Sequence, residues 1–246
     1  MALKIMDESR KANPMNSIRA LAYAIKHGAK ISSNSYGDFA KNYCVDVNEK
    51  LTELLSKNPE HLFVVAAGNV GGNNDDIPAC PCNANAKNVI CVAASTKERK
   101  MWEDSNFGPK NVHVFAPGED IFSLWKHNKT SNMPYAYTYK YSTGTSMATP
   151  FVSGLAALIS SIKNGLGGEK VKELIMGNVN TTMSDSSGNF VKSGGIIDVS
   201  KTIKNLSMYA IITTFCCYVS ARLGTHDDFN FPLKLASFND SCSMQR

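Results

Sequence analysis

The amino-acid sequence predicts an α/β domain built around a mostly parallel sheet. Residues 62–66 form an uninterrupted apolar run, which is typical of a strand buried on both faces of such a sheet. Residues 3–7 and 29–32 have the character of short strands, and residues 13–28 have that of a helix, so a right-handed crossover between parallel strands is expected. The chain has 246 residues, 43% of them apolar, which is enough for a substantial core.

The helix expected over residues 13–28 has both start and stop signals. Asn13 is a candidate N-cap, and Pro14 suits the first helical position because its missing N–H would have no partner there. Four apolar residues recur at helical spacing and form one face: Ile18, Leu21, Ala22 and Ile25. Gly28 is a suitable residue just beyond the C-terminal end of this helix.

A second helix is predicted after Gly144, which frees the backbone for a tight turn. Pro150 is expected in its first turn, where it would cost no helical hydrogen bond. One apolar face follows, made of Val152, Leu155, Ala156 and Ile159. Ser146 then lies at the helix N-terminus, where unpaired N–H groups and the helix dipole favour the negative charge of an oxyanion. The alternative for Ser146 is a plain N-cap.

Two further segments have local signals. Residues 169–176 are expected to form a short helix whose inward-facing residues are Val171, Leu174 and Ile175. Residues 72–76 are polar and rich in turn-forming residues, and their spacing is not that of an EF-hand calcium loop. We therefore expect residues 72–76 to be a solvated loop.

The seven cysteines are an odd number, so at least one of them has no partner within the chain. Three of them lie close together in the sequence and could suggest a metal site: Cys80, Cys82 and Cys91. Their spacing fits no zinc pattern. A disulfide such as Cys80–Cys91 is plausible in an oxidising compartment, but the sequence leaves the pairing open.

Several segments together resemble the subtilisin-like serine proteases, or subtilases. The first is Thr143–Gly154, which resembles the segment around the family's nucleophile, with Thr143 and Phe151 replacing the usual Ser and His. Neither of these two positions carries the chemistry in that family. Asn69 ends an Ala-Gly-Asn segment like the family's own, although an ordinary turn residue after a strand is the alternative. Further similar segments follow in the family's order at residues 77–94, 107–123 and 194–199.

The resemblance implies a subtilisin-like fold, with helices on both faces of the sheet, and serine endopeptidase activity. It implies that Ser146 is the nucleophile and that the Asn69 amide and the Ser146 backbone N–H hold the oxyanion. It also implies a substrate groove along which a peptide adds as a strand. The residues that would line this groove are Ser35, Tyr36, Gly37, Ala67, Gly68 and Thr145, and the alternative for the first three is an ordinary βα loop.

The aspartate and histidine segments of a subtilisin-type triad are missing from the chain. In subtilisins the triad runs Asp, His, Ser, so both should precede the strand at residues 3–7. None of the five histidines lies in a matching segment: His27, His61, His113, His127 and His226. We therefore expect residues 1–205 to be the C-terminal part of a catalytic domain and residues 206–246 to be an unrecognised tail. A serine without a base is a poor nucleophile, so the chain alone should be nearly inactive.

Partners and compartment are expected mainly from the resemblance. It implies a polypeptide substrate, a prodomain in the full-length protein and a secretory location, with no cofactor needed for chemistry and a structural calcium ion allowed. The net charge of +5 is interspersed, and the apolar run over 208–219 is too short for a bilayer, so neither nucleic acid nor a membrane span is expected. The alternatives are a pseudoprotease or peptide-binding module, and an unrelated doubly wound domain with an accidental motif.

Overall fold

The computed structural model describes residues 1–7, 13–37, 41–126 and 137–206. The chain divides into two compact units, Met1–Thr202 and Ile203–Arg246. All of the elements considered below lie in the first unit. The assignment of residues 206–246 as an unrecognised tail stays a prediction, since residues 207–246 lie outside the described part.

A four-stranded parallel sheet forms the centre of the first unit. Its strands are β1 (Ile31–Asn34), β2 (Leu62–Ala66), β3 (Val89–Ser95) and β4 (Val114–Pro117), paired in that order. Every residue of β2 and β3 is buried, as the apolar run over 62–66 predicts. The predicted α/β class with a parallel sheet is confirmed.

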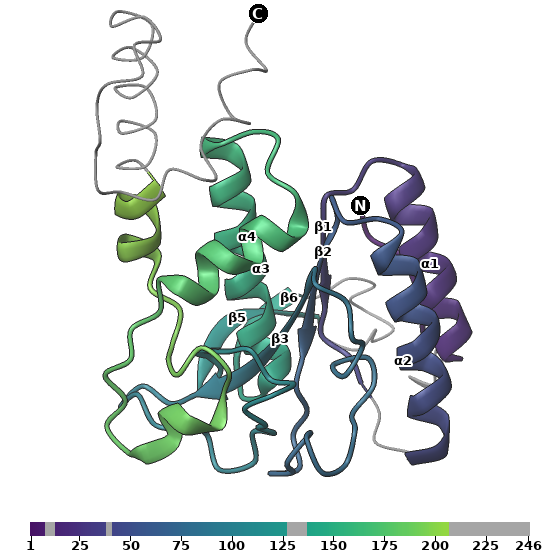
Figure 1. The fold of residues 1–246 in the computed structure, drawn as a ribbon. Coiled ribbons are helices and arrows are strands. Elements are labelled where there is room, and N and C mark those ends of the chain that lie inside the picture. Colours follow the sequence, from purple (N-terminus) through teal and green to yellow (C-terminus); the bar gives the residue numbers. More distant parts are fainter. Residues whose placement is uncertain (8–12, 38–40, 127–136, 207–246) are drawn as a thin grey trace, which may run out of the picture. The chain divides into compact units, whose positions relative to one another are not determined.

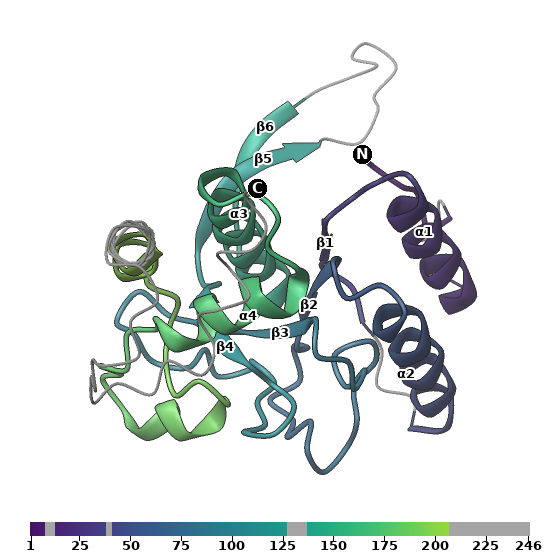
Figure 2. The ribbon, with the colours of Figure 1, turned by 45° about the horizontal axis from the view of Figure 1, so that its top comes forward.

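Helices cover both faces of this sheet. Helices α1 (Pro14–Lys26) and α2 (Lys41–Ser56) lie on one side, and α3 (Thr145–Ile162) and α4 (Gly168–Gly177) lie on the other (Figure 1, Figure 2). The remaining elements are the antiparallel pair β5 (Ile121–Lys126) and β6 (Tyr137–Ser142) and the short 3₁₀ helix η1 (Ser186–Phe190).

Helix α1 begins and ends at the predicted signals. The Met15 N–H donates to Oδ1 of Asn13 at 2.9 Å, and Pro14 occupies the first position. His27 is the C-cap, and Gly28 has φ +81°, a left-handed conformation that glycine adopts without strain. The local caps therefore account for both ends of this helix.

Helix α3 buries the predicted face of Val152, Leu155, Ala156 and Ile159. Pro150, however, is the sixth helical residue and lies in the second turn, so its predicted place in the first turn is wrong. Because proline has no N–H, the carbonyl of Ser146 four residues earlier receives no helical hydrogen bond. Within the described ranges, α3 is the one helix with the length and apolar composition of a membrane span, and a core helix meets the same criteria.

Three elements differ from the expectation. Residues 3–7 form no strand and contain only one bridge residue, Met6, whereas a strand needs a continuous ladder of hydrogen bonds. Helix α2 was not predicted, although its buried residues recur at helical spacing: Cys44, Val47, Leu51 and Leu55. The pair β5–β6 was also missed, and it places Ile121 opposite Ser142.

Two disulfides connect segments around the sheet. Cys44 of α2 is bonded to Cys80, and Cys82 is bonded to Cys91 of β3, with Cα–Cα distances of 5.0 and 5.3 Å. The predicted Cys80–Cys91 pair is therefore wrong, because helix α2 brings Cys44 against Cys80. The three cysteines that could suggest a metal site are all used in these bonds. Cys216, Cys217 and Cys242 lie outside the described residues.

We expect the Cys44–Cys80 bond to contribute more stability than the Cys82–Cys91 bond. The two bonds close loops with sequence separations of 36 and 9, so loop entropy predicts about 4 and about 2.5 kcal/mol. Urea unfolding of the double variants Cys44→Ala/Cys80→Ala and Cys82→Ala/Cys91→Ala should show this order in the free energy of unfolding. Equal losses, or none, would contradict the pairing.

Candidate active site

The predicted site residues lie at one edge of the sheet, where the parallel strands end. Residues 35–37 follow β1, residues 67–69 follow β2, and Ser146 is the second residue of α3. A pocket of about 120 Å³ lies between these segments. Its lining includes seven of the eight predicted site residues: Tyr36, Gly37, Ala67, Gly68, Asn69, Thr145 and Ser146. The eighth, Ser35, is hydrogen-bonded to Ser146. The fold therefore brings the eight predicted site residues together. Their chemical roles stay predictions.

The carboxamide of Asn69 is held by Thr145. Oδ1 of Asn69 accepts hydrogen bonds from the Thr145 N–H at 2.8 Å and from Thr145 Oγ1 at 2.9 Å. The same Thr145 hydroxyl accepts from the Gly68 N–H at 3.1 Å, and the Thr145 residue is fully buried. Because Oδ1 is fixed on this side, Nδ2 of Asn69 is turned away from Thr145. No described residue accepts a hydrogen bond from Nδ2. The sequence did not indicate this positioning role of Thr145.

Ser146 and Ser35 are joined by two hydrogen bonds. Ser35 Oγ donates to the Ser146 carbonyl at 2.8 Å, and Ser146 Oγ donates to the Ser35 carbonyl at 3.3 Å. The Ser146 carbonyl is available because Pro150 cannot donate to it. The Ser146 N–H is at the helix N-terminus and has no acceptor among the described residues. Two donors without partners, this N–H and Nδ2 of Asn69, therefore belong to residues that line the same pocket.

Gly144 precedes α3 in a conformation reserved for glycine. Its φ is +147° with ψ 166°, and a Cβ added there would lie 3.3 Å from both Nδ2 and Oδ1 of Asn69. Any side chain at this position would strain the backbone and press on the carboxamide. The close approach explains the glycine at this point of the sequence.

Replacing Gly144 by alanine should destabilise the protein by about 1–3 kcal/mol and displace Asn69. Gly154→Ala is the matched control, because Gly154 lies inside α3 with no atom within 4 Å of an added Cβ. It should raise stability by about 0.5–1 kcal/mol. Urea unfolding measures the free energy of unfolding of both variants. An unchanged free energy of unfolding in Gly144→Ala would refute the steric argument.

A network of asparagines holds the segment that carries Asn69. Oδ1 of Asn106 accepts from the N–H groups of Val70 and Gly72 at 3.0 and 3.2 Å. Nδ2 of Asn106 donates to Oδ1 of Asn74 at 2.8 Å, and Asn74 in turn donates to the Ala67 carbonyl at 3.0 Å. Asn74 and Asn106 are both buried, so these bonds have little competition from water. No pattern in the sequence pointed to either residue.

The loop at residues 72–76 is bound to its neighbours, so the prediction of a solvated loop is wrong. Asp75 accepts from the Lys110 N–H at 3.0 Å and from the N–H and Nδ2 of Asn111 at 3.0 and 2.7 Å. These hydrogen bonds join the loop to residues 110 and 111. Among the described residues, no group of three or more His, Cys, Asp or Glu could hold a metal.

The half-buried Tyr36 is a neutral hydrogen-bonding group. Burial raises its pKa to about 12, and a hydrogen bond with Ser17 partly opposes this rise. Its hydroxyl donates to Oδ1 of Asn34 at 3.2 Å. Tyr36 therefore does not titrate near neutral pH and does not act as a base at the pocket.

The three described histidines are engaged away from Ser146. Nδ1 of His27 lies 2.8 Å from the Tyr23 carbonyl. His61 contacts the Ala29 carbonyl at 2.8 Å and Ser32 Oγ at 2.9 Å, and burial lowers its pKa. His113 contacts the Cys91 N–H and Lys172. His127 and His226 lie outside the described residues.

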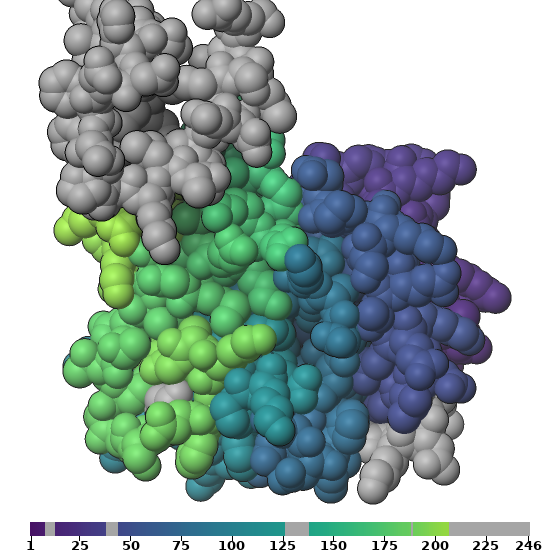
Figure 3. Space-filling view, viewed as in Figure 1, coloured from purple at the N-terminus to yellow at the C-terminus, as the bar shows by residue number. Residues whose placement is uncertain are grey.

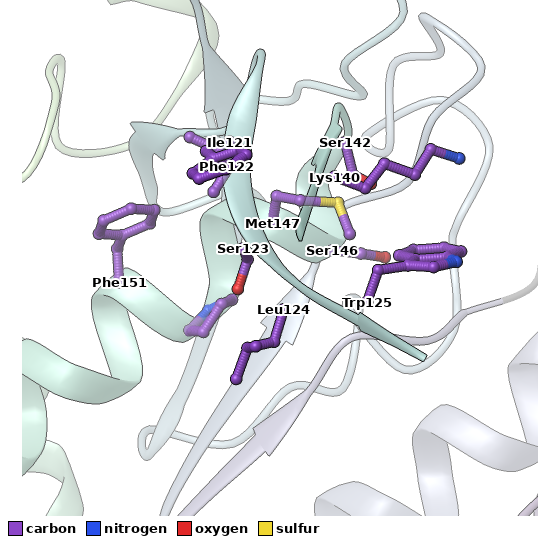
Figure 4. A pocket seen from close by; sticks show the side chains of 11 residues that line it. Ile121, Phe122, Ser123, Leu124, Trp125, Lys140, Ser142, Ser146, Met147 and Phe151 are labelled. Carbon is purple, nitrogen blue, oxygen red and sulfur yellow. The ribbon is translucent and has the colours of Figure 1, made fainter. Parts of the chain in front are cut away.

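A second, larger hollow lies on the side of Ser146 that faces the β5–β6 pair. It has a volume of about 420 Å³ and an aromatic and aliphatic lining. Figure 4 shows Ser146 and Met147 beneath the strands, with Trp125 and Lys140 to one side and Phe151 to the other. Phe122 and Leu124 on β5 are more than half exposed. The alternation of tyrosine with polar residues over 137–142 was the available sequence signal for this feature.

Comparison with known proteins shows which family the chain is similar to. A family model described as "Subtilase family" matches residues 1–195. Subtilisin-like protease 2 of Plasmodium falciparum is 31% identical over 164 residues, which cover 66% of this chain and 11% of that protein. The extracellular basic protease of Dichelobacter nodosus is 41% identical over 106 residues, which cover 43% of this chain and 16% of that protein.

Solved structures show the same fold. The prenylagaramide maturation protease PagA has a TM-score of 0.61 at 27% identity, over 81% of this chain and 70% of that one. A lanthipeptide protease has a TM-score of 0.66 at 20% identity, over 84% of this chain and 69% of that one. The chain spans from 11% to 46% of the length of the curated relatives it matches.

Proposed function

Because the chain belongs to the subtilase family, we propose that it supplies the nucleophile and the oxyanion-binding groups of a serine endopeptidase. In this proposal, Ser146 Oγ attacks the carbonyl carbon of the scissile peptide bond. The Ser146 N–H and Nδ2 of Asn69 donate hydrogen bonds to the oxyanion that forms. The single observation that carries this proposal is the Thr145–Asn69 contact, which leaves Nδ2 of Asn69 unpaired at the pocket that Ser146 also lines.

The general base and its carboxylate partner come, in this proposal, from residues outside these 246. The three described histidines have other contacts, and the sequence contains no segment like the family's histidine segment. A hydroxyl without a base gives up its proton poorly near neutral pH. The chain on its own should therefore hydrolyse peptides only marginally, whereas the full-length protein should be active.

A polypeptide substrate would lie along residues 35–37 and add to the end of β1 as a strand. Gly37 lets this segment lie close to residue 80, because a Cβ there would be 3.0 Å from the Cys80 carbonyl oxygen. The apolar hollow beneath β5 and β6 favours an apolar side chain next to the scissile bond. The chemistry proposed here uses no cofactor.

A secretory location is part of the proposal. Two disulfides occur among the described residues, and such bonds persist in oxidising compartments. One relative carries the name "Extracellular basic protease". A prodomain in the full-length protein remains an expectation from the family resemblance.

Labelling with a fluorophosphonate tests the proposal. The reagent reacts with an activated serine, so in the full-length protein it should label Ser146 and block hydrolysis of a peptide substrate. Peptide mapping by mass spectrometry locates the label. If the full-length protein binds peptides but is neither labelled nor able to hydrolyse them, the proposal is wrong and the protein is a peptide-binding module without catalysis.

A further inference from the structure

A pocket of about 320 Å³ surrounds Lys172 and shares no lining residue with the two hollows beside Ser146. It lies between α4, the segment before β3 and the segment before β4. Figure 3 shows the face on which these segments meet. The segments before β3 and β4 are blue to teal, and α4 is green. Nothing in the proposed protease chemistry uses this pocket.

Hydrogen bonds define the protonation states of His113 and Lys172. The Cys91 N–H donates to Nδ1 of His113 at 2.9 Å, so this nitrogen carries no proton and the neutral ring has its proton on Nε2. Nε2 lies 2.8 Å from Nζ of Lys172. With Nε2–H as the donor, Nζ must accept, and only a neutral amine has the lone pair to do so. The geometry is therefore that of an uncharged lysine beside a neutral histidine.

The surroundings favour the uncharged amine. Burial and the charge of Lys192 lower the pKa of Lys172 to about 8, while Glu169 opposes this. Burial, together with Lys172 and Lys192, lowers the pKa of His113 well below its usual value.

The other charged groups of the pocket are Lys87, Lys110 and Glu173. The carboxylates of Glu169 and Glu173 form ion pairs with other lysines. Glu169 lies 3.4 Å from Lys87, and Glu173 lies 2.7 Å from Lys170. Within the described part of the chain, no ion pair holds the Lys172 ammonium. The lowered pKa makes the neutral amine that the hydrogen bond requires more accessible near neutral pH than in an ordinary lysine.

We propose that Lys172 is a nucleophilic amine that captures small aldehydes bearing an anionic group. Rotation about the Cε–Nζ bond turns the lone pair from His113 toward the pocket. Nζ attacks the carbonyl carbon and forms a C–N bond, its protons pass to the carbonyl oxygen, and that oxygen leaves as water to give an imine. Three further lysines line the pocket and attract the anionic group: Lys87, Lys110 and Lys192.

Reductive labelling with pyridoxal 5′-phosphate and sodium cyanoborohydride tests this proposal. We would use the full-length protein with Ser146→Ala, so that it cannot digest itself, and quantify each modified lysine by peptide mapping between pH 6 and 10. Lys172 should react about tenfold faster than the exposed Lys170 of the same helix at pH 7.5. The rate at Lys172 should reach half of its plateau near pH 8.

Two comparisons complete the test. Lys172→Arg keeps a long basic side chain but removes the nucleophilic amine, so the rapid labelling at position 172 should vanish, whereas Lys170→Arg should leave it unchanged. Pyridoxal, which lacks the phosphate, should react more slowly at Lys172. Two results in the protein that retains both lysines would overturn the proposal. One is an equal labelling rate at Lys172 and Lys170, and the other is a labelling rate at Lys172 that has no plateau with pH.

Discussion

Replacing Ser146 by alanine in the full-length protein should lower kcat for peptide hydrolysis by about 10⁶ and abolish fluorophosphonate labelling. This magnitude is the one known for the nucleophile of subtilisin. The physical reason is that alanine offers no oxygen to attack the carbonyl carbon, so the covalent route is closed. The fold should persist, because the lost hydrogen bond from Ser146 Oγ to the Ser35 carbonyl is long, at 3.3 Å.

Ser153→Ala is the matched control for this change. Ser153 lies on the same helix, α3, and its hydroxyl donates to the Thr149 carbonyl at 3.1 Å. Its loss should leave kcat and labelling unchanged. Hydrolysis that survives Ser146→Ala, with Ser153→Ala equally active, would show that another group is the nucleophile.

Replacing Asn69 by alanine should lower kcat by about 10²–10³, with little change in KM. This range is also known from subtilisin. Nδ2 of Asn69 would meet the substrate oxygen mainly when it becomes an oxyanion, so the loss should fall on the transition state. The measurement is kcat and KM for one peptide substrate in the full-length protein.

Two variants separate the donor at Asn69 from its structural contacts. Asn69→Asp keeps oxygens that can accept from the Thr145 N–H and hydroxyl, but it removes the donor and adds a negative charge beside the oxyanion. Its kcat should fall at least as far as that of Asn69→Ala. Thr145→Val removes the hydroxyl that joins Asn69 to Gly68, so it should lower kcat less. A rise in KM with kcat unchanged in Asn69→Ala would contradict the oxyanion assignment.

The elements that the sequence predicted well are those whose signals lie within one segment. Strand β2 is buried along its whole length, so an apolar run suffices to identify it. Helix α1 has its N-cap, its proline and its terminal glycine within the same stretch. The buried face of α3 likewise follows from spacing alone.

The wrong predictions depended on contacts between distant segments. The partner of Cys80 is Cys44, 36 residues away on a helix that was not predicted from the sequence. The loop at 72–76 is held by residues 110 and 111, whose N–H groups donate to Asp75. A polar composition predicts exposure when such partners are not known, and here the partners are supplied by another part of the chain.

By itself, the sequence determined the parallel sheet, the helix that presents Ser146 and the choice of Asn69 and Ser146 as candidate site residues. The sheet and the helix follow from local spacing, whereas the choice of Asn69 and Ser146 follows from the resemblance of several segments, in order, to the subtilases. Only the tertiary structure decided how Thr145 orients Asn69, how Pro150 frees the Ser146 carbonyl for Ser35, and how His113 meets Lys172. The reason is that hydrogen-bond direction depends on which atoms the fold brings within about 3 Å of each other, and the linear order of residues does not contain that information.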